Sequence, residues 1–176
     1  MDDIDYEQMY RELRENRSFS MKLIDGALLQ LMYCFEDEDL IQHRLAYYPS
    51  PDLRPFREDP DLYLRDELYL DIVSRRIVPF PLRFDLDKKA AREVVHPGCH
   101  LSLGDVRGCR IPVSAPLTPR WFIEFILRNF YQTDRHDFVH FLPRHRLNLR
   151  ETITPKERGL IHVVVPSVFS VPLTSV

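Results

Sequence analysis

Glycine is scarce in this chain, and its scarcity excludes the common nucleotide-binding loops. Only 5 of the 176 residues are glycine, whereas 14 are proline. Neither GxxxxGK nor GxGxxG, the glycine-rich patterns that cradle phosphates, occurs in the sequence. We therefore expect no P-loop and no dinucleotide-binding loop, and we predict no cofactor. The prolines divide the middle of the chain into short extended pieces.

Three further shortages narrow the class of protein. The 3 cysteines are an odd number, which makes no disulfide framework and indicates reduced thiols in a cytosol. No apolar run approaches the roughly 20 residues that span a bilayer, and the acidic start is unlike a signal peptide. The net charge of −3 lacks the basic surplus of a typical nucleic-acid-binding protein. We expect a soluble cytoplasmic protein that does not act at a membrane.

The composition is otherwise that of one globular domain. Hydrophobic residues make up 44% of the chain and aromatic residues 11%, which suffices for a core at this length. We find no internal repeat, and we predict one domain over residues 1–176, with 166–176 as a flexible tail. Helices, then strands, then a helix predict an α+β domain. Its mainly antiparallel sheet is packed by N-terminal helices and by one long helix near 119–131.

Helical periodicity occurs near the N-terminus and after residue 118. Apolar positions within residues 3–16 share one flank, which predicts a first helix. A wide apolar face over residues 20–35 predicts a second helix deep in the core, although Gly26 costs it on the order of 1 kcal/mol. Thr118 is a suitable N-cap for the long helix, which has a proline at its first position.

Alternation with a period of two predicts the strands. Residues 40–48 form one strand, and residues 76–87 form another with an apolar face that includes Phe80. Two prolines on the opposite face of 76–87 predict a strand that either lies at the sheet edge or carries a bulge. Residues 101–103 and 109–113 flank a glycine-containing connection and predict a hairpin, and the apolar run 160–165 predicts a last strand.

The densest group of reactive side chains lies at residues 96–110. This segment holds two of the seven histidines, two of the three cysteines and three of the five glycines. One interpretation is purely structural, with proline and glycine shaping a turn and both histidines bonded to nearby carbonyls. The alternative interpretation is a site for chemistry.

Two imidazoles and an arginine are the groups that metal-free cleavage of a phosphodiester needs. One group takes the 2′-hydroxyl proton, a second protonates the leaving oxygen, and a cation balances the phosphoryl oxygens. Imidazole, with an ordinary pKa of about 6.5, performs both proton transfers. We predict that His96 and His100 form this pair, with Arg83 or Arg110 stabilising the charge and Asp85 beside them.

Metal sites are weaker alternatives. Zinc ligation by His96, Cys99, His100 and Cys109 would stabilise the hairpin, but adjacent residues of a strand point to opposite faces and no Cys-x2-Cys knuckle is present. The carboxylates at 85 and 87 share a strand face suited to Mg²⁺, although no partner motif accompanies them. We therefore predict no metal ligands.

A basic stretch interleaved with aromatic residues lies near the C-terminal end. Its candidate nucleic-acid-binding residues are Arg144, His145, Arg146 and Arg150. Cations mixed with aromatic rings contact single-stranded nucleic acid in other proteins. The alternative is a solvated surface without a ligand.

Several longer strings carry a family resemblance. These are RIVPFPLRFD at 76–85, HPGCHLSLG at 96–104, CRIPV at 109–113 and PLTP at 116–119, and also IDGALLQLMY at 24–33 and HRLAYYPSP at 43–51. Together they resemble the bacterial domain-of-unknown-function family 2290. The resemblance implies no activity, but it suggests mobile-element or antiphage-defence neighbourhoods.

Three functional hypotheses follow. The first is an accessory or interaction module of a bacterial system that binds another protein of that system, or RNA or DNA. The second is a small metal-independent ribonuclease or phosphodiesterase with a His/Arg site. The third is a zinc-stabilised structural domain.

Overall fold

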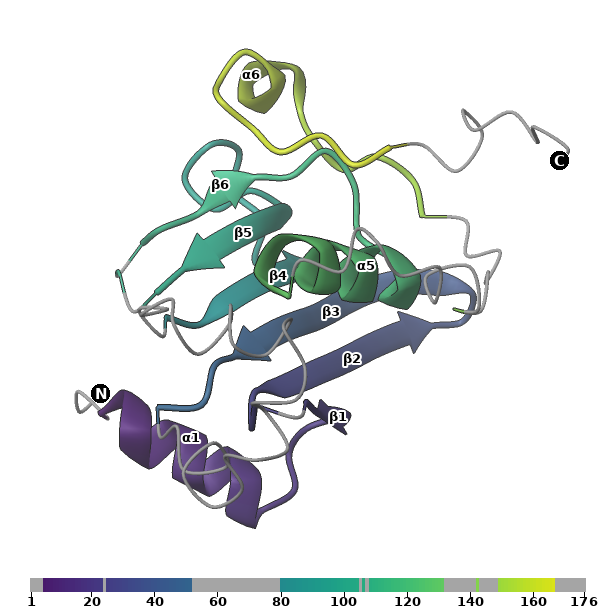
Figure 1. Cartoon of the computed structure of the whole chain (residues 1–176). Helices are drawn as coiled ribbons and strands as arrows, with labels where there is room; N and C mark the ends of the chain where they lie inside the picture. The colour runs from purple at the N-terminus through teal and green to yellow at the C-terminus, as the bar shows by residue number, and fades with distance from the viewer. Residues whose placement is uncertain are drawn as a thin grey trace, which may run out of the picture.

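A six-stranded antiparallel sheet organises the chain (Figure 1). The computed structural model describes residues 5–23, 25–51, 80–104, 106, 108–131, 142 and 149–166. The strands follow one another in the order β1-β2-β3-β4-β5-β6, so each pairs with its neighbours in sequence. The α+β architecture is confirmed. The elements are α1 (Tyr6–Glu15), β1 (Met21–Lys22), β2 (Leu28–Glu36), β3 (Asp39–Tyr48), β4 (Leu82–Asp87), β5 (Cys99–Leu103), β6 (Ile111–Pro112), α5 (Pro119–Phe130) and α6 (Pro155–Arg158).

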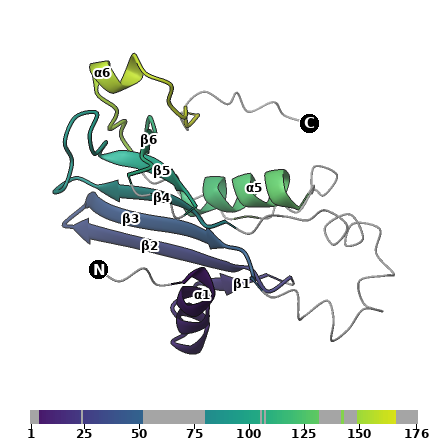
Figure 2. The same cartoon turned by 90° about the vertical axis from the view of Figure 1, so that its left-hand side faces the viewer.

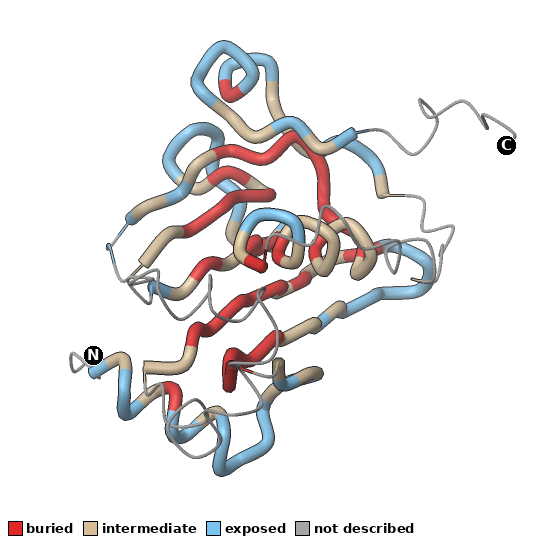
Figure 3. The backbone as a smooth tube through the Cα atoms, viewed as in Figure 1, coloured by how far each residue is buried: buried red, intermediate tan, exposed pale blue. Residues whose placement is uncertain are grey.

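Helix α5 covers one face of the sheet (Figure 2). It begins as the sequence predicts, because the Thr118 hydroxyl accepts a hydrogen bond of 3.2 Å from the Trp121 backbone N–H. Its buried residues Phe122 and Ile126 pack against the apolar side chains of the central strands. The ring of Phe122 meets that of Phe84 edge-on at 6.2 Å. Figure 3 shows the buried stretches of the strands in red, with α5 lying across them.

Helix α1 packs on the opposite face, at one end of β2 and β3. Its Tyr10 joins a small cluster with Leu28, Ala46 and Tyr48, whose positions in the strands alternate with those that face α5. The first predicted helix is therefore confirmed over Tyr6–Glu15. Farther along, the same face of β3, β4 and β5 carries polar and charged side chains, and it is there that the candidate site lies.

The predicted second helix over 20–35 is wrong. Of the two predicted N-terminal helices, only the first is therefore present. The segment forms β1, a turn and the nine-residue β2. Gly26 has φ +88°, which a helix interior does not accept, and the Asp25 carboxylate receives the Ala27 N–H at 2.9 Å. Leu28 and Leu29 point to opposite faces, each covered by a different helix, so the apolar run lacks the alternation of a half-exposed strand.

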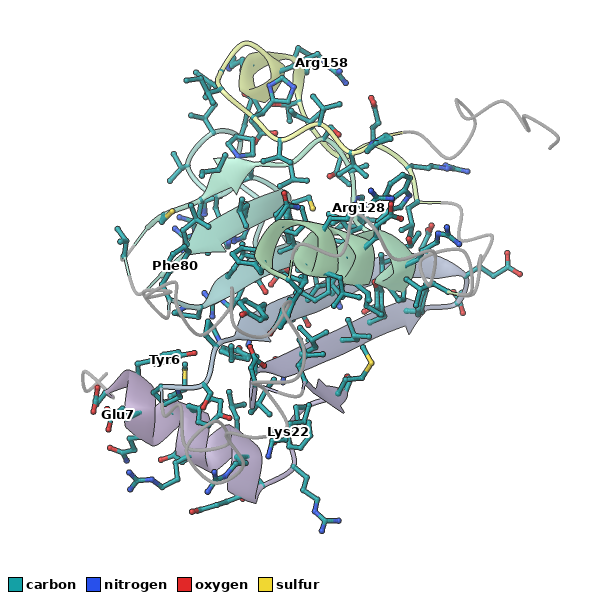
Figure 4. All side chains as sticks on the ribbon, in the orientation of Figure 1. Tyr6, Glu7, Lys22, Phe80, Arg128 and Arg158 are labelled. Atoms are coloured by element: carbon teal, nitrogen blue, oxygen red, sulfur yellow. The ribbon has the colours of Figure 1, made fainter. Side chains whose placement is uncertain are left out.

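The prediction that the 76–87 strand lies at an edge or carries a bulge is also wrong for its described part. β4 lies inside the sheet, and it pairs in continuous register with β3 on one side and with β5 on the other. Pro81 does not disturb it, because Pro81 precedes the strand and its carbonyl accepts the Gly104 N–H at 2.8 Å. Pro79 lies outside the described residues. Phe80 is not a core residue, because 42% of its surface is exposed (Figure 4).

In the C-terminal part, the predicted hairpin is confirmed and the predicted strand over 160–165 is wrong. β5 and β6 pair antiparallel, as the sequence predicts. Within 160–165, however, only Val163 forms a bridge, parallel to Val113, and Ile161 is 93% exposed. The element that orders this segment is α6, whose Thr154 and Glu157 form a capping box. The predicted tail lies outside the described residues from 167 onward, and no described helix is long and apolar enough to cross a membrane.

Candidate functional site

The site is built on a row of side chains that crosses three strands. In the antiparallel register, Asp85 of β4 lies opposite Arg44 of β3 and also opposite His100 of β5. Arg83 lies one step along the same face of β4, opposite Ser102. Five polar residues from three strands therefore share one patch of the sheet, on the same face as α1.

Asp85 is the central anion of this row. It is only 9% exposed, and its two oxygens take one arginine each. The Arg44 Nε donates to Oδ1 at 3.0 Å, and the Arg83 Nε lies 3.6 Å from Oδ2. Each arginine thus meets the carboxylate through Nε, while its side chain stays about two-fifths exposed, at 43% and 39%. Asp85 holds two guanidinium groups in place over the sheet.

His100 presents a neutral imidazole with a defined tautomer. The residue is 4% exposed, and Nδ1 lies 3.0 Å from the Pro97 carbonyl oxygen. Because a carbonyl only accepts, Nδ1 carries the proton and Nε2 keeps its lone pair. Burial lowers the pKa of His100, with His96 and Arg110 acting in the same direction, against the opposing effects of the Pro97 carbonyl and Asp85. The ring is therefore uncharged at neutral pH.

His96 stands beside His100 on a tight turn. The two ring centroids are 5.0 Å apart and the rings are tilted by 60°. The turn is closed by paired backbone hydrogen bonds between Arg92 and His96, at 2.8 and 2.7 Å. Within it, Val94 has φ +68°, a conformation that strains a β-branched residue.

A buried carboxylate holds this turn from outside the sheet. Glu157 of α6 is 1% exposed, and its Oε1 accepts the Val94 N–H at 3.0 Å while Oε2 accepts the Thr154 N–H at 2.9 Å. Beside it, Lys156 donates to Glu93 at 2.8 Å. Figure 1 shows α6 at the end of the molecule opposite α1, next to β6. A helix near the C-terminus thus fixes the turn that carries His96.

The predicted site residues line a single cavity of about 490 Å³. We call this cavity the His/Arg hollow. Its polar lining consists of Gln42, Arg44, Arg83, Asp85, Asp87, His96, His100, Ser102 and Arg110, with backbone and smaller side chains completing the wall. All five residues that the sequence nominates for chemistry line it: Arg83, Asp85, His96, His100 and Arg110.

Cations exceed carboxylates around the hollow. Arg44, Arg83 and Arg110 face Asp85 and Asp87, while the chain as a whole carries a net charge of −3. The local excess therefore opposes the overall composition. Among the described residues no carboxylate pairs with Arg110, so its charge is available to a ligand. Such a surface suits an anion with several oxygen acceptors.

His43 lies next to the row but on the other face of the sheet. It packs against the ring of Tyr33, and its Nε2 is 4.0 Å from the sulfur of Cys99. Its Nδ1 is buried and has no hydrogen-bond partner in the structure. Burial lowers the pKa of His43 to about 4, and burial also raises the pKa of Cys99. Both are packing residues, and Cys99 is no nucleophile.

The four residues that the zinc interpretation needs do not all face the same side of the sheet. Cys99 points into the core and His100 into the hollow, because adjacent residues of β5 face opposite ways. Over the described ranges, no three histidine, cysteine or acidic side chains are grouped as metal ligands. Asp85 is instead engaged by two arginines, and Asp87 accepts the N–H groups of Lys89 and Ala90.

The predicted nucleic-acid contact in the basic stretch stays a prediction. Arg144, His145 and Arg146 lie outside the described residues, and Arg150 is exposed. Sequence reasoning missed Arg44, Gln42 and Ser102 as members of the site. Arg44 alternates with the core residues of its strand, which places it on the polar face, but only the β3–β4 register shows that it meets Asp85.

Comparisons with known proteins identify a family without an activity. The family model DUF2290, described as an uncharacterized conserved protein, matches residues 1–165. No curated protein matches the chain, and no solved structure does. The function must therefore be argued from the site itself.

Proposed function

We propose that this chain, which belongs to the uncharacterized conserved family DUF2290, is a metal-independent ribonuclease that cleaves phosphodiesters in the His/Arg hollow. The observation that supports the proposal most is the arrangement of two adjacent imidazoles and three arginines around one cavity. A neutral base, a second imidazole and excess positive charge are what transfer of a phosphoryl group to a neighbouring hydroxyl requires.

His100 acts as the base. Its Nε2 lone pair takes the proton of the ribose 2′-hydroxyl, and the 2′-oxygen then forms a bond to phosphorus. The Pro97 carbonyl fixes the tautomer, and burial keeps the ring neutral so that it is ready to accept a proton.

His96 acts as the acid. In its protonated form it donates to the 5′-oxygen as the bond from phosphorus to that oxygen breaks. The products are a 2′,3′-cyclic phosphate and a free 5′-hydroxyl, and no oxidant, reductant or metal takes part. The proton gained by His100 and the proton lost by His96 balance, so solvent restores both rings.

The arginines bind the non-bridging oxygens. Arg83 and Arg110 are the predicted charge-stabilising residues, and Arg44 joins them through Asp85. Asp85 does not contact the phosphate in this scheme, but it aims the two guanidinium groups. Preorganised cations need little rearrangement as negative charge develops on the phosphoryl group.

The test compares cleavage of labelled RNA in EDTA by the wild-type chain and by His100→Ala. We expect the variant to lose about 10²–10⁴-fold in rate, which is the usual contribution of a general base. His162→Ala, which changes a histidine outside the hollow, serves as the matched control and should retain full activity.

Three results would contradict the proposal. Equal cleavage by wild type and His100→Ala indicates a contaminating nuclease. Cleavage only with Mg²⁺ moves the chemistry to the carboxylates. RNA binding without cleavage contradicts the ribonuclease proposal and favours an interaction module. In that hypothesis, a bacterial defence or mobile-element system supplies the partner.

A further inference from the structure

A second basic cavity adjoins the His/Arg hollow. It measures about 320 Å³ and is lined by Lys89, Ala90, Ala91, Arg92, Val95, His96 and Arg110. We call it the Lys/Arg hollow. His96 and Arg110 line both cavities, so the two hollows share a wall at the proposed acid and at one phosphate-binding arginine.

The Lys/Arg hollow is shaped by the connection between β4 and the His96 turn. The Asp87 carboxylate receives the N–H groups of Lys89 and Ala90, at 3.0 and 2.9 Å, and so fixes the start of this connection. The alanines at 90 and 91 have short side chains, which let a ligand approach the backbone closely. Arg92 is held in turn by its two backbone bonds to His96.

The charges of the second cavity are positive and mostly unopposed. Lys89 pairs with Glu36, whereas Arg92 has no carboxylate partner within the part of the chain that the structure describes. None of the described residues that line this cavity is acidic. Arg110 stands between the two hollows, where one guanidinium can bridge neighbouring phosphates of a single strand.

We infer that the Lys/Arg hollow is a second phosphate subsite, so that the substrate is an internal stretch of single-stranded RNA and not a mononucleotide or a terminal phosphate. The inference rests on the proposed function, because it takes the His/Arg hollow as the place of the scissile phosphate. The next phosphate of the strand then lies against Arg92 and Arg110.

The experiment uses short strands of thymidine deoxynucleotides, which lack the 2′-hydroxyl and are bound without being cleaved. Strands with one, two and three phosphodiesters are titrated into the full chain by calorimetry. We expect the affinity to rise about tenfold when the second phosphodiester is added. Arg92→Ala should remove that rise and leave the affinity for the one-phosphodiester strand unchanged.

Salt dependence adds a second readout. On the longer strands, Arg92→Ala should reduce the slope of log affinity against log salt by about 0.7, the value for one phosphate contact on a single strand. Lys22→Ala, which removes an exposed lysine in β1, is the matched control and should change neither quantity.

The outcomes separate this inference from the proposed function. The inference of a second subsite is contradicted if the affinity does not rise with the second phosphodiester. It is also contradicted if Arg92→Ala lowers the affinity for all strands equally. If the rise occurs but RNA of the same lengths stays intact, the second subsite stands and the ribonuclease proposal fails. If RNA is cleaved but the affinity does not rise with the second phosphodiester, the ribonuclease proposal stands and the second subsite fails.

Discussion

At the residue scale, two buried histidines face opposite sides of the sheet. His43 of β3 faces the core beside Cys99, and His100 of β5 faces the hollow. Burial lowers the pKa of both. At His100 this supports a role as base, whereas at His43 it has consequences only for stability.

Replacing His43 tests that difference through the pH dependence of folding. Its pKa is about 4 in the folded chain against about 6.5 unfolded. The unfolded state therefore binds more protons between these values, and the stability is fully present above pH 6.5 and is lost as pH falls toward 4. We expect wild type to lose up to about 1.4 kcal/mol of unfolding free energy per pH unit more than His43→Leu in this window.

Urea unfolding followed by circular dichroism at several pH values measures this effect. His162→Leu, at a partly exposed position, is the control and should keep the wild-type slope. A His43→Leu variant whose stability falls as steeply as that of wild type between pH 6.5 and 4 would show that His43 is not held neutral.

The sequence predicts the chemical role of each residue better than it predicts which other residues it contacts. Side-chain alternation places Arg83 and Asp85 together, and it separates Cys99 from His100. It does not say which strand lies beside β4, so the contact between Arg44 and Asp85 is visible only in the register. The chemical type of a side chain is read from its own position in the sequence, whereas the pairing of strands depends on residues far away in the sequence.

At the element scale, α6 and the turn at 92–96 form one supporting unit for His96. The strained Val94 is held by a hydrogen bond to Glu157, a residue more than sixty positions away. A turn that carries strain is kept in place only when its surroundings over-determine it. Glu157 thus positions the turn that carries His96, although it does not itself line the His/Arg hollow.

Replacing Glu157 should release the turn. Glu157→Ala leaves the Val94 and Thr154 N–H groups without their acceptor, and we expect it to lower the unfolding free energy by about 2–4 kcal/mol. If RNA is cleaved, the variant should lower kcat more than it raises KM, because His96 acts on the reacting oxygen. Thermal unfolding and steady-state kinetics measure the two effects.

A rescue separates positioning from general damage. Val94→Gly removes the strain at φ +68°, so adding it to Glu157→Ala should restore part of kcat. Glu151→Ala removes an exposed carboxylate that pairs with Arg158, and it should leave both stability and kcat unchanged. If Glu157→Ala lowers stability but leaves kcat unchanged, Glu157 has no positioning role.

Elements with local signals are predictable from this sequence, and elements defined by distant packing are not. The long helix has a threonine cap and a proline at its start, so its bounds follow from residues 118–131 alone. The start of β2 is buried on both faces, because Leu28 packs in the cluster with α1 and Leu29 in the cluster with α5, and such an apolar run resembles that of a buried helix. α6 has only four residues, too few for a period.

At the scale of the whole molecule, the meander of strands explains why a site exists here. Each strand lies beside its sequence neighbours, and helix α5 covers one face completely enough to form the core. The other face is covered by α1 at one end, and farther along it holds the His/Arg hollow. The Lys/Arg hollow adjoins it in the connection that follows β4. A chain with net charge −3 thus carries two adjoining basic hollows.

The chemical identity of the RNA ends tests metal-independent cleavage in the His/Arg hollow most directly. Mass spectrometry of a short RNA, incubated in EDTA with the chain, identifies both ends at the cut. Attack by the 2′-hydroxyl predicts a 2′,3′-cyclic phosphate on one fragment and a 5′-hydroxyl on the other, with neither formed by an identically purified His100→Ala variant. Ends with a 5′-phosphate and a 3′-hydroxyl, intact RNA, or the same cyclic ends from His100→Ala would contradict it.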